Sequence, residues 1–179
     1  MKRFALLAAL LLASCGTPPR ERFYTLEAPE PPVAAPDAPT VAVGPVSVPE
    51  MVDRPQFVVR TSANEVVIAE QARWAEPLKS AIARVVAANL AAELGMRVGA
   101  RNEADYRVTL DVQRFDSGPD QAVLVDAAWT VSGPKGRRTG RSVVQEKTAT
   151  KFYDALAAAH SAALAAISKE IAAAIREQK

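Results

Sequence analysis

The sequence predicts an α/β (α+β) fold: a two-layer sandwich in which a mostly antiparallel sheet carries two long helices packed on one face. Several segments between residues 41 and 148 alternate apolar and polar side chains, which is the period of strands with one face in water. Two other segments, 77–94 and 154–175, repeat apolar residues every three or four positions, as amphipathic helices do. Because the sheet has one dry face, we expect both helices to cover that face.

Residues 1–14 have the features of an export signal. Lys2 and Arg3 give a positively charged start, and Phe4–Ala13 is an unbroken run of ten apolar residues. As a helix this run is about 15 Å long, roughly half the thickness of a bilayer core, so it is too short for an ordinary transmembrane helix. We therefore predict that residues 1–14 are removed as a signal peptide.

The only cysteine of the chain, Cys15, stands directly after this run. Leu12-Ala13-Ser14-Cys15 resembles the bacterial lipobox, which implies a lipoprotein signal and a mature chain that begins at Cys15. The resemblance also implies a covalent diacylglycerol and an N-acyl chain such as palmitate on Cys15, and two or three acyl chains anchor a protein stably. Gly16 in place of an aspartate favours the outer membrane. An ordinary secretory signal with a chance cysteine is the alternative.

The charge balance and the cysteine count exclude several classes of partner. The chain carries 22 basic and 20 acidic residues, and removal of Lys2 and Arg3 with the signal leaves 20 of each. This neutrality argues against nucleic acid, which requires a basic face. An acylated Cys15 leaves no thiol for a disulfide or a metal site. We predict no cofactor other than the covalent lipid.

Residues 15–40 are predicted to be an acylated, proline-rich tether. They hold seven of the thirteen prolines, which favour extended chain without backbone pairing. Residues 27–39 would reach about 40 Å in that conformation and would lift a domain clear of the headgroups. Residues 23–26 are apolar and β-prone, and we expect them to pair with the domain as a short strand. Residues 41–179 are predicted to form a single periplasmic α/β domain.

The elements of this domain follow from pattern and turn residues. Strands are expected over residues 41–48, 57–61, 65–68, 106–113, 123–131 and 141–148, with turns at 62–64, 116–120 and 132–140. Gly44 and Pro45 within the first strand predict an edge position or a bulge. Pro77 is expected in the first turn of one helix, and Gly95 after its end. Asp154 is expected to cap the other helix.

The sequence contains no recognisable catalytic constellation. His160 is the only histidine, and it lies on the apolar stripe of the last helix, where its neighbour Ser161 points about 100° away. A general base needs a nucleophile and an orienting acid within reach, so a core histidine is favoured over a catalytic one. The carboxylates are not clustered at ligand spacing, so no metal site is expected. We predict that the protein is not an enzyme.

Two groups of charged residues are candidate contact surfaces. Four basic residues are expected to gather at one hairpin tip: Lys135, Arg137, Arg138 and Arg141. Such a tip would meet lipid headgroups or an acidic partner, although a solvated turn is the more common case. In the loop at residues 49–55, Asp53 and Arg54 either contact a partner or form an ion pair that fixes the loop.

Four segments follow the lipobox in a characteristic order: Phe23–Leu26, Val43–Pro49, Val52–Gln56 and Arg73–Leu78. Together they resemble the PqiC/YmbA family of ABC-type transport auxiliary lipoproteins. The resemblance implies a non-enzymatic outer-membrane lipoprotein, lipid-anchored on the periplasmic face. Its partner would be an MCE-domain protein, whose hydrophobic conduit carries phospholipid between the two membranes. The lipoprotein would dock that conduit at the outer membrane and support envelope integrity.

A second hypothesis is an envelope lipoprotein with a structural or assembly role, which binds other outer-membrane or periplasmic proteins without taking part in transport. A periplasmic hydrolase is disfavoured because the nucleophile–base pair is missing. The sequence leaves open which lipid is transported, which surface binds the partner and whether the domain forms a homo-oligomer.

Overall fold

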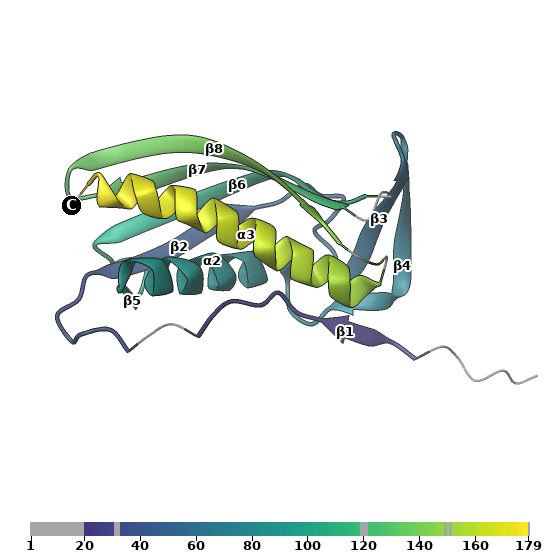
Figure 1. The fold of residues 1–179 in the computed structure, drawn as a ribbon, viewed down its shortest axis with the longest axis horizontal. Helices are drawn as coiled ribbons and strands as arrows, with labels where there is room; N and C mark the ends of the chain where they lie inside the picture. Colours follow the sequence, from purple (N-terminus) through teal and green to yellow (C-terminus); the bar gives the residue numbers. More distant parts are fainter. Residues whose placement is uncertain (1–19, 31–32, 119–121, 149, 151, 179) are drawn as a thin grey trace, which may run out of the picture.

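The computed structural model describes residues 20–30, 33–118, 122–148, 150 and 152–178 (Figure 1). In this part of the chain eight strands form one sheet: β1 (Arg22–Tyr24), β2 (Thr40–Ser47), β3 (Gln56–Ser62), β4 (Glu65–Trp74), β5 (Arg97–Val98), β6 (Tyr106–Ser117), β7 (Ala122–Gly133) and β8 (Gly136–Lys147). The helices are α2 (Leu78–Leu94) and α3 (Tyr153–Arg176).

The sheet is organised around β6, which has neighbours on both sides. On one side β7 and β8 follow as an antiparallel meander. On the other side β2 runs parallel to the first half of β6, and β3 meets its end through the Val59–Ser117 pair. The three antiparallel pairs have the longest registers, and the parallel pairs that add β1, β2, β3 and β5 are shorter. The sheet is therefore mostly antiparallel, as predicted.

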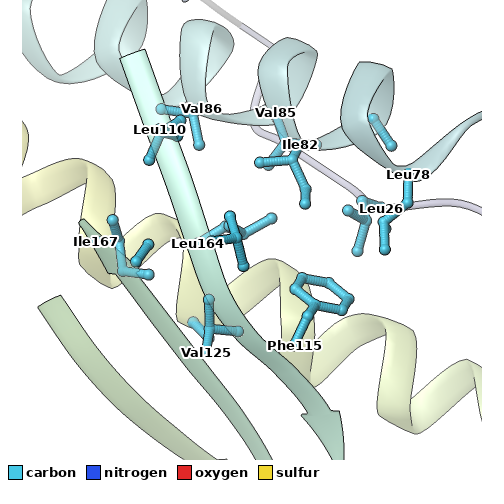
Figure 2. Packing of buried hydrophobic residues seen from close by; sticks show 14 of the residues in the cluster. Leu26, Leu78, Ile82, Val85, Val86, Leu110, Phe115, Val125, Leu164 and Ile167 are labelled. Carbon is cyan, nitrogen blue, oxygen red and sulfur yellow. The ribbon is translucent and has the colours of Figure 1, made fainter. Parts of the chain in front are cut away.

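Both helices pack on one face of this sheet and against each other (Figure 1). Figure 2 shows the contact between the layers: Ile82 and Val85 of α2 and Leu164 of α3 lie beside Leu110 of β6 and Val125 of β7. All five side chains are almost completely buried, and each such burial stabilises the fold by about 1.5–3 kcal/mol. The predicted two-layer α/β sandwich is confirmed.

β2 is interrupted at Gly44-Pro45, as the sequence predicted. Its register against β6 shifts between Val43 and Val46. Gly44 has a φ of 133°, a conformation that side chains disfavour, and Pro45 has no N–H to donate to the ladder. Pairing resumes after the bulge and ends at Ser47, opposite Asp111, so the end of β6 is left open to β3.

The helices begin slightly differently from the prediction. Pro77 is the N-cap of α2 and not part of its first turn. α3 begins at Tyr153 with Phe152 as its N-cap, so the prediction that Asp154 caps this helix is wrong. Packing decides this boundary, because the ring of Tyr153 lies against Phe57 of β3 with centroids 5.3 Å apart. Asp154 instead lies in the first turn, where its negative charge interacts favourably with the positive end of the helix dipole.

The hairpin between β7 and β8 is much tighter than the predicted turn at residues 132–140. β7 continues to Gly133 and β8 already begins at Gly136, which has a φ of 108°. Gly140, expected in the turn, lies within β8 opposite Trp129, whose indole occupies the space that a larger residue would need. Arg141 is therefore a mid-strand residue and does not lie at the hairpin tip.

The expected short strand near the N-terminus is present, one residue earlier than residues 23–26 and ending at Tyr24. This strand, β1, pairs in parallel with the end of β4, and the carbonyl of Tyr24 accepts a hydrogen bond from the N–H of Ala75 at 2.8 Å. Leu26 is 1% exposed, and its carbonyl accepts a hydrogen bond from Arg84 of α2 at 3.0 Å. This segment is thus an integral part of the domain.

The proline-rich stretch after β1 has both of its ends fixed on the domain. Leu26 is buried at its start, and the N–H of Arg97 donates to the carbonyl of Pro39 at 2.9 Å at its end. Because both ends are held, residues 27–39 do not lengthen the connection between Cys15 and the sheet. The spacer of about 40 Å that the sequence suggested is therefore not available to lift the domain from a membrane.

Candidate functional site

Residues 1–19 lie outside the described residues, so the signal peptide, the acylated Cys15 and the first residues of the tether stay predictions from the sequence. Within the described ranges, neither helix has the length and the apolar character that crossing a bilayer requires. The candidate partner contact at Asp53 and Arg54 does lie in the described chain.

The loop at residues 49–55 joins β2 to β3 and is held in a fixed conformation. Val52 is 5% exposed and anchors the loop in the core. The N–H of Val52 donates to the carbonyl of Pro49 at 3.0 Å, and the N–H of Trp74 donates to the carbonyl of Pro55 at 2.7 Å. These bonds present the charged residues of the loop at the surface, next to the start of α2.

Asp53 and Arg54 form no ion pair with each other in the described structure. Instead the Asp53 carboxylate accepts a hydrogen bond from the ammonium group of Lys79 at 2.6 Å, across 26 residues of sequence. The two side chains are 40% and 44% exposed, so the pair contributes no more than about 1 kcal/mol. Among the described residues, Arg54 has no ion-pair partner.

Beside this loop the surface is hollowed into an open cleft of about 370 Å³. It is lined by Asp53, Arg54, Pro55, Trp74, Ala75, Glu76, Pro77 and Leu78. Glu76 is paired with Arg84 of α2, and Asp53 is paired as described above. Arg54 is therefore the one charged lining residue without a partner in the described chain. We refer to this feature as the Arg54 cleft.

The Arg54 cleft combines apolar walls with a single uncompensated guanidinium. Trp74, Pro55 and Pro77 supply rigid apolar surface, and such surfaces bind with little loss of side-chain entropy. A guanidinium prefers carboxylate oxygens, which it can bind in a bidentate manner. The cleft is suited to a protein segment that places an apolar side chain next to a carboxylate.

His160 lies in the core and not at a surface site. Its Nε2 is 3.0 Å from the Ser117 hydroxyl, and its ring stacks on Phe115 with centroids 3.9 Å apart. Both polar residues are at most 2% exposed, and His160 Nδ1 has no hydrogen-bond partner among the described residues, so this serine–histidine contact lacks both access and an orienting acid. Burial lowers the pKa of His160 to about 3, which keeps the imidazole neutral.

The described residues include no group of three or more His, Cys, Asp or Glu side chains arranged to hold a metal ion. Asp116 and Asp126 of the sheet pair with arginines instead. Asp126, for example, accepts two hydrogen bonds from Arg141, which hold the pKa of its carboxyl below the usual range.

The predicted basic cluster at a hairpin tip holds in part: three of its four residues lie in or next to the turn, whereas Arg141 lies farther along β8. Lys135 occupies the turn. Arg138 pairs with Glu177 at 2.9 Å, and Arg141 pairs with Asp126 at 2.6 Å. Two of the four cations are therefore engaged within the domain.

Sequence reasoning missed Lys79 and Arg84, the two α2 residues that neutralise the acids of the Arg54 cleft. Basic residues on the polar face of an amphipathic helix are common, so the sequence held no signal specific to them. Their roles depend on the packing of α2 beside the loop at residues 49–55.

Solved structures share this fold. A crystal structure of an uncharacterized protein has a TM-score of 0.76 at 23% sequence identity and covers 88% of this chain and 99% of its own. Protein XCC0632 from Xanthomonas campestris, of the DUF330 family, has a TM-score of 0.63 at 19% identity and covers the same shares. No curated protein matches the chain.

These likenesses show the fold class, a two-layer α/β domain. A more specific match extends over residues 24–172, and the chain belongs to the family of ABC-type transport auxiliary lipoprotein components. The resemblance to PqiC/YmbA proteins is thereby confirmed. The family description implies partners in a transport complex.

Proposed function

We propose that this protein is an outer-membrane lipoprotein that serves an MCE-type intermembrane lipid transport system as a non-enzymatic auxiliary subunit. Anchored through Cys15 and facing the periplasm, it docks the periplasm-spanning conduit at the outer membrane. Phospholipid moves through the conduit, and the lipoprotein supports envelope integrity by holding the conduit in place. The observation that carries this proposal is the family match over residues 24–172, which spans the whole sheet from Tyr24 and most of α3.

The Arg54 cleft is the proposed docking site for the MCE-domain partner. Its loop is held by backbone hydrogen bonds and by Val52, so binding requires little ordering of the chain. Its acids are neutralised within the domain, which leaves Arg54 free to bind a carboxylate of the partner. The partner segment that enters the cleft would carry an acidic residue beside an apolar one.

The test is site-specific photo-crosslinking in intact cells. A photoreactive amino acid replaces Arg54 in one variant and Arg137 of β8 in a matched control, because Arg137 is also exposed and forms no ion pair in the described part of the chain. We expect position 54 to capture an MCE-domain protein and position 137 to capture none. A complementary variant, Arg54→Glu, should lose co-purification of that protein while the thermal stability of the domain is unchanged.

The same experiment addresses the second hypothesis. If position 54 crosslinks only to outer-membrane or cell-wall proteins, the result would favour the structural or assembly role and contradict the transport role. Loss of thermal stability in Arg54→Glu would show that this residue supports the fold, which would remove the argument for the cleft as a docking site.

The proposed anchor has its own test. A Cys15→Ser variant lacks the thiol that accepts the diacylglycerol, so it should be recovered without acyl chains and outside the outer-membrane fraction. Mass spectrometry of the mature N-terminus and membrane fractionation measure both results. Normal acylation of this variant would contradict the assignment of Cys15.

A further inference from the structure

We propose that the end of the domain formed by β1, β4 and the start of α3 lies directly on the phospholipid bilayer that holds the anchor, with Phe23 and Phe152 inserted among the headgroups. This inference rests on the proposed acylation of Cys15. It adds to the proposed function an orientation of the domain and a second, non-covalent contact with lipid.

The exposed apolar side chains are concentrated at this end. Among the described residues seven large apolar side chains are exposed, and four of them belong to β1, β4 or the N-cap of α3: Phe23, Val67, Ile68 and Phe152. The two phenylalanines are 60% and 71% exposed. Neither takes part in the aromatic contacts of the core, so no packing role within the domain accounts for them.

Phe23 and Phe152 come from distant parts of the chain but lie near each other. Each is followed by a tyrosine, and the rings of Tyr24 and Tyr153 are in contact with centroids 5.8 Å apart. β1, β4 and the start of α3 lie at the same end of the molecule, opposite the end that carries β5 and the C-terminus (Figure 1). Phe23 and Phe152 therefore belong to the same end of the domain.

The length of the connection to the anchor limits how far this end can lie from the bilayer. Seven residue steps separate Cys15 from Arg22, which span at most about 25 Å when fully extended. A domain of this size has a diameter of roughly 40 Å. β1 cannot peel away to lengthen the connection, because Leu26 is buried and Arg84 holds its carbonyl. The β1 end is thus the part of the domain nearest to the acyl chains.

The charges at this end suit phosphate headgroups. Arg20 and Arg22 are exposed and have no ion-pair partner among the described residues. The acid between them, Glu21, is neutralised by Arg73 of β4 at 2.9 Å. Basic side chains beside aromatic ones are the composition of segments that lie in the interface of a membrane, where each cation contributes about 1 kcal/mol.

The test uses the acylated mature chain, which begins at Cys15, in vesicles of phosphatidylethanolamine and phosphatidylglycerol. Because the lipid blocks the thiol of Cys15, one introduced cysteine is the only site for a nitroxide label. Labels are placed by Phe23→Cys and Phe152→Cys, with Val98→Cys and Val143→Cys as controls, since these valines are also exposed (54% and 59%) but lie on β5 and β8. Collision with dissolved oxygen reports lipid, and collision with a water-soluble nickel complex reports solvent.

We expect the labels at positions 23 and 152 to collide mainly with oxygen and the controls mainly with nickel. A second variant replaces both phenylalanines with charged residues, Phe23→Asp and Phe152→Asp. It carries its label at Val67→Cys on β4. This label should collide with nickel several times more often than the same label in the chain with both phenylalanines, while the circular dichroism spectrum stays unchanged.

The outcomes separate the orientation from the proposed function. Labels at 23 and 152 that report solvent on a chain still bound to vesicles would overturn the orientation and leave the anchor in place. A chain that does not stay with the vesicles would overturn the anchor and the orientation together. The identity of the transport partner affects neither the label measurement nor the binding to vesicles, because the vesicles contain no other protein.

Discussion

His160 should make the stability of this fold depend on pH between about 7 and 5. In this range the carboxylates of the domain do not change its stability. The imidazole is fully buried between Phe115 and the edge of Trp74, and burial lowers its pKa from the usual 6.5 to about 3. As pH falls from about 6.5 towards 3, the unfolded chain binds a proton at this site and the folded chain does not. The free energy of unfolding must therefore decrease as pH falls through this window.

The size of the effect follows from the two pKa values. Between pH 7 and pH 5 the unfolded state gains about 2 kcal/mol relative to the folded state, since each pH unit below 6.5 is worth about 1.4 kcal/mol. The carboxyl pKa values of Asp105 and Asp126 are also lowered in the folded state, but these groups change the stability at lower pH. Their stabilisation is complete above about pH 4 and is lost only as pH falls further. The interval from pH 7 to pH 5 thus reports mainly on His160.

The assay is urea denaturation at several pH values from 7 to 5, followed by circular dichroism, on a chain that begins at Arg20. His160→Gln cannot titrate, so its free energy of unfolding should vary little across this interval even though its absolute stability is lower. Ser117→Ala is the matched control, because it removes the hydrogen bond to Nε2 and keeps the imidazole. It should lose about 1–3 kcal/mol and retain the slope.

A wild-type chain with no slope between pH 7 and pH 5 would refute the reasoning, since it would require His160 to bind a proton in the folded state. An equal slope in His160→Gln would also refute it, because the pH dependence would then come from other groups. A flattened slope in Ser117→Ala would assign the effect to the hydrogen bond instead of to burial.

Three further outcomes follow from the packing. Leu26→Ala should lower the free energy of unfolding by about 2–5 kcal/mol and speed hydrogen exchange in β1; unchanged exchange would show that the strand is held independently. Gly140→Ala should cost about 1–3 kcal/mol and change the near-ultraviolet circular dichroism of Trp129, whose indole occupies the place of the new methyl group; an unchanged spectrum would contradict this packing. Asp53→Ala should change stability by less than about 1 kcal/mol in thermal melts, because its pair with Lys79 is exposed, and a larger loss would show that the pair fixes the loop.

The sequence determined the kinds of elements and the layer arrangement of this protein. The alternation of Tyr106, Val108 and Leu110 specified β6 and its buried face, because a strand turns successive side chains to opposite sides. The apolar stripes of α2 and α3 required a common partner, and the dry face of the sheet was the only one large enough. Gly44 and Gly95 marked a bulge and a helix end, because their conformations are local properties of the backbone.

The tertiary structure alone decided what the charged residues and the N-terminal segment do. Asp53 pairs with Lys79 and Arg141 with Asp126, and neither pairing could be read from spacing, because the partners meet only after separate elements have packed. The proline-rich stretch looked like a spacer, since composition describes the freedom of a chain and not where its ends are held. Burial of Leu26 fixes that end on the domain and shortens the connection from Cys15 to the sheet. Local sequence specifies local conformation, whereas contacts across the chain depend on which surfaces exclude water together.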